Sequence, residues 1–325
     1  MSVVLIALAV ILAAHLIALL VATRVITASI AAEIEPGGRM VSVAGGRLHL
    51  FDLPASDPTP GETILLLHGA TANARDMVLA LGDALSRHHR VIAIDRPGHG
   101  FSDRVGGADS ASPARQADLI VAALDELGLD RVVVVGFSLA GAVATNLALD
   151  HPTRVSGLVV LAGVTHPWPG GINWYYRLAA RPVIGTLFTQ TLIAPIGSWG
   201  FQQAIEASFA PNAAPAHYSR DAAAALILRP ETFGWNAQDV DALYDFIVRQ
   251  APRYGEIRVP TAILHGEADL TVYASIHSIP LAQKIAGARL TLLPGIGHML
   301  HHAARPTVLA EIEAVARAAR ERGNP

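Results

Sequence analysis

The stretch RVVVVGFSLAGAVATNLAL, residues 131–149, is the part of the sequence that decides the fold. Arg131 is followed by four consecutive valines, a short run of β-branched apolar side chains that predicts a buried strand over 131–135. Residues 138–149 then predict a helix. Gly136 and Ala140 lie two positions on either side of Ser138, where a sharp strand-to-helix turn needs small neighbours. The sequence therefore places a serine hydroxyl on a tight turn, with the positive N-terminus of a helix below it.

Strands and helices alternate on both sides of this stretch. We predict strands over 39–43, 47–53, 63–67, 90–94, 131–135, 157–161, 260–265 and 290–294, and helices over 74–86, 113–127, 138–149 and 308–320. Short, wholly apolar strands that alternate with helices indicate a parallel sheet covered on both faces. We therefore expect a protein of the α/β class.

The alternation stops near Thr165 and resumes near Arg258, which indicates an insertion. The segment 165–256 holds 14 of the 18 aromatic residues, including all four tryptophans. Bulky side chains of this kind can form the core of a small helical insert. They can also line an apolar pocket over the edge of the sheet, because ligand pockets are mostly apolar. Both interpretations stay open for any single aromatic residue.

Three polar side chains follow predicted strand ends and suggest nucleophilic chemistry. A serine hydroxyl is a weak nucleophile until a base activates it. His298 lies in a Gly-flanked loop beyond the last predicted strand and is the candidate base, and Asp269 follows the preceding strand as the candidate acid that orients it. The order Ser138, Asp269, His298 along the chain is typical of one α/β architecture. Glu267 is the alternative acid.

The segment HGA, residues 68–70, ends the strand predicted over 63–67. The backbone N–H groups of Ala70 and Leu139 are candidate donors for an oxyanion hole, which stabilises the negative oxygen formed when a nucleophile attacks a carbonyl. We interpret His68 as a structural hydrogen-bonding residue, and His301 and His302 as surface residues at a helix start. The sequence has no cysteine and no His-Glu-x-x-His spacing, so we expect neither a metal nor a cofactor.

Five motifs together resemble the α/β-hydrolase superfamily: HGA at 68–70, DRPGHGFS at 95–102, GFSLAG at 136–141, HGEAD at 265–269 and GIGHM at 295–299. The resemblance implies an α/β-hydrolase fold with a mostly parallel eight-stranded sheet, helices on both faces, and a helical cap between strands six and seven. It also implies that Ser138 is the nucleophile, His298 the base and Asp269 the acid, and that 95–102 is a mainly structural loop. Ala140 departs mildly from the usual Gly.

The N-terminus predicts a membrane segment. Residues 3–23 carry no formal charge, and 21 helical residues span about 30 Å, the hydrocarbon thickness of a bilayer. A cleaved signal peptide is the rival interpretation, but no basic residue precedes the run and the run is too long. Arg24, Arg39 and Arg47 follow it and weakly favour a catalytic domain on the cytoplasmic side of a single-pass anchor, with the extracytoplasmic side as the alternative.

We therefore expect an anchor and linker over 1–35 and an α/β-hydrolase domain over 36–325, with its helical cap at about 165–256. The leading hypothesis is a serine hydrolase that cleaves a carboxylic ester with an apolar acyl or alcohol group, through an acyl-enzyme. Alternatives are a carbon–carbon bond hydrolase, a cofactor-free perhydrolase, an acyltransferase, or a non-catalytic binder. The expected partners are a small apolar or lipid-like ester and a membrane. The near balance of 24 basic and 27 acidic residues argues against a nucleic-acid partner.

Overall fold

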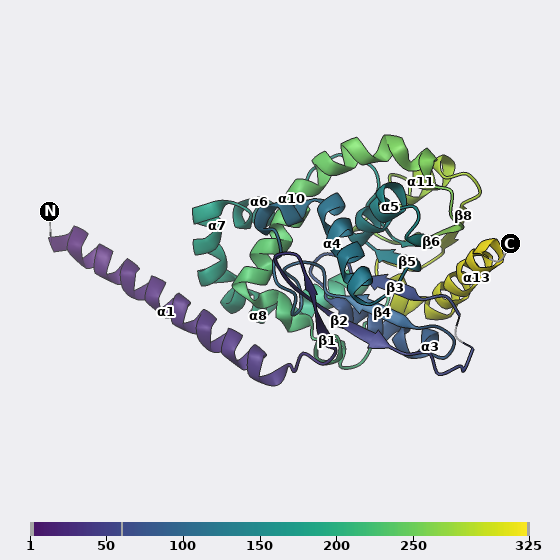
Figure 1. The fold of residues 1–325 in the computed structure, drawn as a ribbon. Coiled ribbons are helices and arrows are strands. Elements are labelled where there is room, and N and C mark those ends of the chain that lie inside the picture. Colours follow the sequence, from purple (N-terminus) through teal and green to yellow (C-terminus); the bar gives the residue numbers. More distant parts are fainter. Residues whose placement is uncertain (1–2, 60, 324–325) are drawn as a thin grey trace.

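The computed structural model describes residues 3–59 and 61–323, and its centre is one eight-stranded sheet (Figure 1). The strands follow one another across the sheet in the order β1-β2-β4-β3-β5-β6-β7-β8. Only β2 pairs antiparallel to its neighbours, β1 and β4, and all other pairs are parallel. The strands are β1 (Arg39–Val43), β2 (Gly46–Leu53), β3 (Ile64–Leu67), β4 (Val91–Ile94), β5 (Val132–Phe137), β6 (Val155–Leu161), β7 (Thr261–Gly266) and β8 (Arg289–Leu293).

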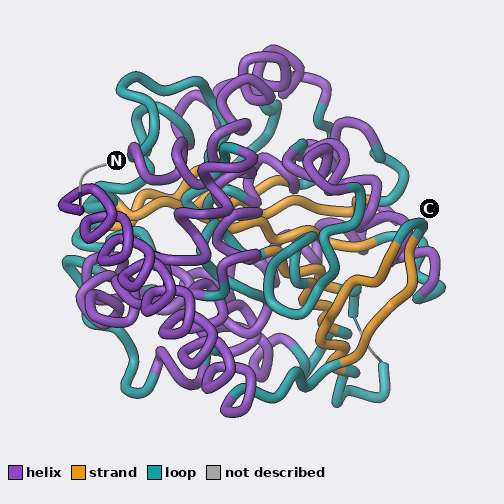
Figure 2. The backbone as a smooth tube through the Cα atoms, turned by 90° about the vertical axis from the view of Figure 1, so that its left-hand side faces the viewer, coloured by secondary structure: helices purple, strands orange, loops and turns teal. Residues whose placement is uncertain are grey.

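Helices cover both faces of this sheet. They are α2 (Ala74–Met77), a π-helical turn η1 (Val78–Gly82), α3 (Asp83–Leu85), η2 (Gly107–Ala111), α4 (Pro113–Glu126), α5 (Ala140–Asp150), α11 (Ser278–Lys284), α12 (Leu300–Ala303) and α13 (Arg305–Gly323). Figure 2 shows the strands crossing the centre of the molecule with helices on either side of them. The predicted mostly parallel sheet of eight strands is confirmed, and each predicted strand lies within two residues of the observed one.

The alternating side chains of β5 divide the core into two halves. Val132 and Val134 pack with α4, α5 and α11 on one face, whereas Val133 and Val135 pack with α2, η1 and α13 on the other. All four side chains are buried, because a central parallel strand is covered on both faces. The continuous apolar run that predicts β5 therefore reflects burial on both sides of the sheet.

The chain between β6 and β7 is helical wherever the structure assigns regular structure to it. It contains α6 (Trp174–Ala179), α7 (Pro182–Phe188), η3 (Thr189–Ile193), α8 (Ala194–Phe209), α9 (Tyr218–Asp221), η4 (Ala224–Leu228), α10 (Pro230–Gln250) and η5 (Ala251–Glu256). We call this segment the helical insert. Trp174 and Trp199 point into solvent, with 69% and 87% of their surface exposed. For these two residues, the expected role in the core of the insert is wrong.

The N-terminal helix α1 (Val3–Glu33) extends away from the sheet (Figure 1). It is long and apolar enough to cross a membrane, and its most apolar window is wholly exposed. This exposure distinguishes α1 from the core helix of a soluble domain, whose apolar side chains are buried by the rest of the fold. A membrane anchor and a signal sequence both have such a helix.

Truncation of a core side chain tests the layered packing. Leu66 is fully buried in β3, so Leu66→Ala should lower the free energy of unfolding by about 2–5 kcal/mol. Val248→Ala removes a partly exposed side chain on α10 and should change it by less than about 0.5 kcal/mol. Chemical denaturation of the full chain measures both. Equal effects of the two substitutions would contradict the assignment of Leu66 to the core.

Candidate active site

Ser138 lies at the C-terminal end of β5 in a strained backbone conformation. Its φ is 53°, in the left-handed region that residues with a side chain seldom adopt. The turn is tight on both sides, because a Cβ on Gly136 would lie 2.5 Å from the carbonyl oxygen of Ala140. Ala140, where the usual pattern has Gly, is fully buried in this turn. Helix α5 begins at residue 140, two residues later than predicted, because Ser138 is not helical.

The structure brings His298 next to this serine. The Nε2 atom of His298 lies 3.0 Å from Ser138 Oγ, and its Nδ1 atom lies 2.7 Å from Asp269 Oδ2. These distances fit a neutral imidazole that donates its Nδ1–H to the carboxylate and accepts the serine hydroxyl proton at Nε2. The whole line is largely buried, since Ser138 and His298 are each 8% exposed and Asp269 is 3% exposed. The three residues singled out in the sequence are therefore joined by a continuous chain of hydrogen bonds.

Asp269 is held in place by more than His298. Its Oδ1 accepts hydrogen bonds from the backbone N–H groups of Thr271 and Val272, and His265 Nε2 lies 3.2 Å from its Oδ2. Burial alone would raise the pKa of Asp269, but the hydrogen bonds from His265 and His298 outweigh it and lower the pKa below the ordinary value. The carboxylate is therefore charged at neutral pH. Glu267, the alternative acid, is exposed.

The loop after β3 approaches the serine from the other side. A Cβ on Gly69 would lie 2.9 Å from the Cβ of Ser138, so only glycine allows this approach. Within the described chain, no hydrogen bond occupies the backbone N–H of Ala70 or of Leu139. Two free donors beside a serine hydroxyl are the arrangement that an oxyanion hole requires.

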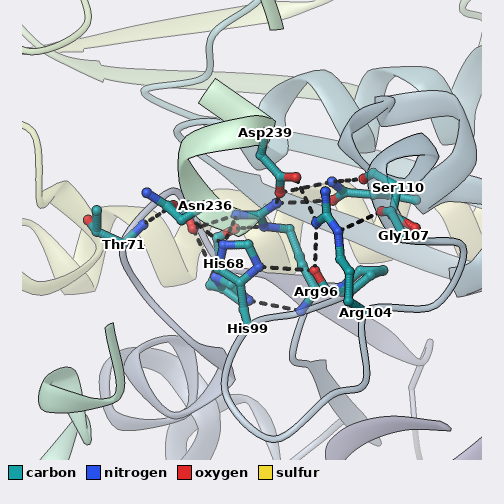
Figure 3. A network of polar contacts seen from close by, with 12 residues as sticks. His68, Thr71, Arg96, His99, Arg104, Gly107, Ser110, Asn236 and Asp239 are labelled. Atoms are coloured by element: carbon teal, nitrogen blue, oxygen red, sulfur yellow. Dashed lines mark hydrogen bonds and ion pairs between the residues drawn. The ribbon is translucent and has the colours of Figure 1, made fainter. Parts of the chain in front are cut away.

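A buried ionic network holds this loop in place (Figure 3). Arg96 is fully buried and donates to the carbonyl oxygens of His68 and Gly69, at 3.1 Å each. Its Nη1 lies 2.7 Å from Asp239 Oδ2, and Arg104 Nη1 lies 2.8 Å from Asp239 Oδ1. Because Asp239 belongs to α10, the network ties the helical insert to the loop beside Ser138.

A second contact joins α10 to the same loop. The side-chain oxygen of Asn236 accepts a hydrogen bond of 2.8 Å from the backbone N–H of Thr71, which follows Ala70 directly. His68 bonds through both ring nitrogens, to the carbonyl oxygen of Gly69 and the N–H of Arg96. Burial lowers the pKa of His68 well below its ordinary value, so its ring is neutral at pH 7. These contacts agree with a structural role for His68.

His301 differs from its expected position. It is fully buried rather than at the surface, and its Nε2 lies 3.0 Å from Asp76 Oδ2, while His302 Nε2 lies 2.8 Å from Asp76 Oδ1. The predicted surface position of His301 was wrong because α12 packs inward, against the sheet. The potential ligand atoms of these three residues lie within 4.8 Å of one another, so they could hold a metal ion. Tyr218 OH also donates to Asp76, and these hydrogen bonds alone satisfy both carboxylate oxygens.

The fold and this geometry agree with comparisons to known proteins. The sequence profile described as "alpha/beta hydrolase fold" matches residues 62–304, which is most of the chain. The chain belongs to this family. It is therefore a hydrolase of the α/β fold, and the expected resemblance is confirmed.

The chain is also similar to individual proteins of this family. The chain is 28% identical to a 2-hydroxy-6-oxo-6-phenylhexa-2,4-dienoate hydrolase of Burkholderia cepacia, over 80% of this chain and 89% of the relative. It is 29% identical to a 2-hydroxymuconate semialdehyde hydrolase of Pseudomonas putida, over 84% and 92%. Among solved structures, Est816, an N-acyl homoserine lactone degrading enzyme, aligns with a TM-score of 0.63 at 25% identity, covering 85% of this chain and 99% of that one.

Sequence reasoning missed several residues around the hydrolase site. His265 lies inside the quoted HGEAD motif, so its contact with Asp269 could have been inferred from its position. Nothing in the sequence indicated that Asn236 and Asp239 are buried, because a polar residue on a helix is usually exposed. Their burial depends on Arg96 and Thr71, which lie more than a hundred residues away in the sequence.

Loss of the carboxylate at the centre of the network should be costly. Asp239→Asn keeps the shape of the side chain but leaves Arg96 and Arg104 without a counter-charge, so the free energy of unfolding should fall by about 3–5 kcal/mol. The matched variant Asp150→Asn disrupts only the surface pair with Arg253 and should cost less than about 1 kcal/mol. Denaturant titration of both variants measures the difference. Equal losses would show that the buried pair contributes no more than the surface pair.

Proposed function

We propose that Ser138 is the nucleophile, His298 the general base and Asp269 the orienting carboxylate of a serine hydrolase. The observation that carries this proposal is the continuous line of hydrogen bonds, 3.0 Å from Ser138 to His298 and 2.7 Å from His298 to Asp269. As Ser138 Oγ adds to a substrate carbonyl carbon, its proton passes to His298 Nε2. The charged Asp269 then stabilises the imidazolium that forms.

The negative oxygen of the tetrahedral intermediate would bind to the N–H groups of Ala70 and Leu139. When the intermediate collapses, the bond from the carbonyl carbon to the leaving group breaks, and His298 returns its proton to that group. A water molecule, deprotonated by His298, then adds to the acyl-enzyme and releases a carboxylic acid and free Ser138. The chain's own backbone thus supplies the charge stabilisation, and no cofactor takes part in these steps.

For the bond that is cleaved, the relatives favour carbon–carbon hydrolysis. By their names, the hydrolases from Burkholderia cepacia and Pseudomonas putida act on a 6-oxo-hexadienoate and on a semialdehyde. For a substrate of this class, Ser138 would add to the ketone or aldehyde carbon, and the neighbouring carbon would leave with the bonding electron pair and accept a proton. We therefore place a vinylogous keto acid first among the substrates, ahead of the carboxylic ester expected from the sequence.

A specific observation keeps an uncharged ester or lactone as the second candidate. A dienoate carries a carboxylate, whose binding in a buried site requires a cation. Arg96, the guanidinium group behind the loop at Ala70, is already bonded to Asp239 and to two backbone carbonyls. Similarity to the lactone-degrading enzyme Est816 supports this candidate as well.

We also propose that α1 is a retained anchor and that residues 1–35 act as anchor and linker. Residues 36–325 would then form the catalytic domain, with the segment of about 165–256 as its cap. The exposure of the apolar part of α1 supports this division. So does the position of the helical insert, whose helix α10 contacts the loop at Thr71 beside Ser138.

Substitution of the nucleophile tests the catalytic assignment. Ser138→Ala should abolish labelling by a fluorophosphonate probe and reduce kcat at least about 10³-fold, because the probe and the substrate both need the hydroxyl. The control Ser56→Ala alters an exposed serine in the loop between β2 and β3 and should leave both unchanged. If Ser138→Ala keeps its activity, the nucleophile is a different residue.

A substrate panel separates the two reaction classes. We expect kcat/KM of the full chain for 2-hydroxy-6-oxo-6-phenylhexa-2,4-dienoate to exceed that for p-nitrophenyl acetate and butyrate. Loss of the dienoate absorbance and appearance of p-nitrophenol give the two rates. The reverse order would select the uncharged ester. Ser138→Ala serves as the blank for both reactions.

A further inference from the structure

The N-terminal helix is only partly free of the rest of the protein. Residues 3–18 are all exposed, whereas Leu19 and Leu20 are half-buried and Thr23 and Ile30 are buried. This second half of α1 packs on η3, α8 and η4 of the helical insert (Figure 1). Ile30, for example, belongs to an apolar cluster with residues of η4.

The free part of α1 is too short to cross a bilayer without bringing the insert close to it. Sixteen helical residues span about 24 Å, and the hydrocarbon layer is about 30 Å thick. The uncharged run continues through Thr23 to the first charge at Arg24, and its last residues already pack on the insert. A spanning α1 therefore holds η3 and α8 at the membrane surface.

A second apolar surface lies on the same part of the insert. It consists of five exposed side chains, Val183, Ile184 and Leu187 of α7 and Ile196 and Trp199 of α8, which we call the apolar cap face. Segment 182–205, which contains all five, has no Asp, Glu, Lys, Arg or His. Exposed apolar patches of this kind mark surfaces that bind a partner or a membrane.

Chemistry and position favour lipid as the partner of this face. The apolar cap face is continuous with the surface against which α1 packs, since α1 contacts α8 itself and η3, which joins α7 to α8. Tryptophan prefers the layer between lipid headgroups and hydrocarbon. Trp199 is the most exposed of the five side chains on this face. Arg177 and Arg181, both exposed, precede α7 and suit anionic headgroups.

We propose that the apolar cap face lies in the interfacial layer of the bilayer that α1 spans, so that α7 and the first half of α8 are docked on the membrane. The proposal extends the anchor at α1 to a second contact and does not depend on which bond the enzyme cleaves. It also gives the exposed Trp199 a role, which packing in the core of the insert does not.

Site-specific fluorescence tests the docking. Because the sequence has no cysteine, Ile184→Cys and Trp199→Cys each provide a unique site for the environment-sensitive dye NBD. The full-length variants would be reconstituted in vesicles of phosphatidylcholine and phosphatidylglycerol, with and without nitroxide-labelled lipid. Ile11→Cys, in the free part of α1, is the control for insertion. Glu126→Cys, at the C-terminal end of α4, is the control for exposure to water, because α4 ends near the start of β5, at the opposite edge of the sheet from Ser138.

We expect NBD at 11, 184 and 199 to lose most of its emission when the lipid carries the nitroxide, and NBD at 126 to keep its emission.

Quenching at 11 but not at 184 or 199 would overturn the proposal, because α1 would then be inserted with the insert away from the bilayer. Blue-shifted but unquenched emission at 184 and 199 would also overturn it, by showing a protein partner or a second copy on this face. Loss of α1 from the membrane-bound protein, detected by its intact mass, would overturn it too. Since no readout is catalytic, failure of the proposed reaction would leave these results unaffected.

Discussion

The left-handed backbone of Ser138 is the constraint around which the rest of the site is organised. A residue with a φ of 53° places its side chain above the end of β5, but only if the chain on both sides stays close-packed. Gly136 and Gly69 meet that requirement, since a Cβ on either would collide with the turn. Sheet order then places the loops after β7 and β8, which carry Asp269 and His298, on the same edge as the serine.

Much of this arrangement could be predicted because it depends on local patterns. Apolar runs at strand length gave the sheet, and small residues around Ser138 indicated the turn. The residues that could not be predicted owe their environment to partners distant in the sequence. Asp239 looks like any polar helix residue until Arg96 is placed beside it, and His301 looks exposed until α12 is packed inward. The position of Trp199 was mispredicted for the opposite reason, because its aromatic side chain suggests burial and the side chain is exposed.

The polar groups near the site serve two separate purposes. His265, His298 and two backbone N–H groups keep Asp269 charged and fixed, which is a requirement of the proposed proton transfer. Arg96 and Asp239 instead hold the shape of the loop at Gly69 and Ala70. Because a buried ion pair adds little stability over an apolar alternative, its value here lies in positioning two segments that are far apart in the sequence.

The bond between Arg96 and Asp239 also limits how the enzyme can open. A lid that swung away on α10 would have to separate two buried charges, and the energetic cost of doing so is several times larger than that of parting apolar side chains. Displacement of α10 from the loop at Gly69 and Ala70 is therefore disfavoured, whereas no comparable ion pair in the described chain joins α6, α7 or α8 to the sheet. The insert is thus held to the sheet by buried charges on the side of α10, and its other side, at η3 and α8, is held by its packing on α1.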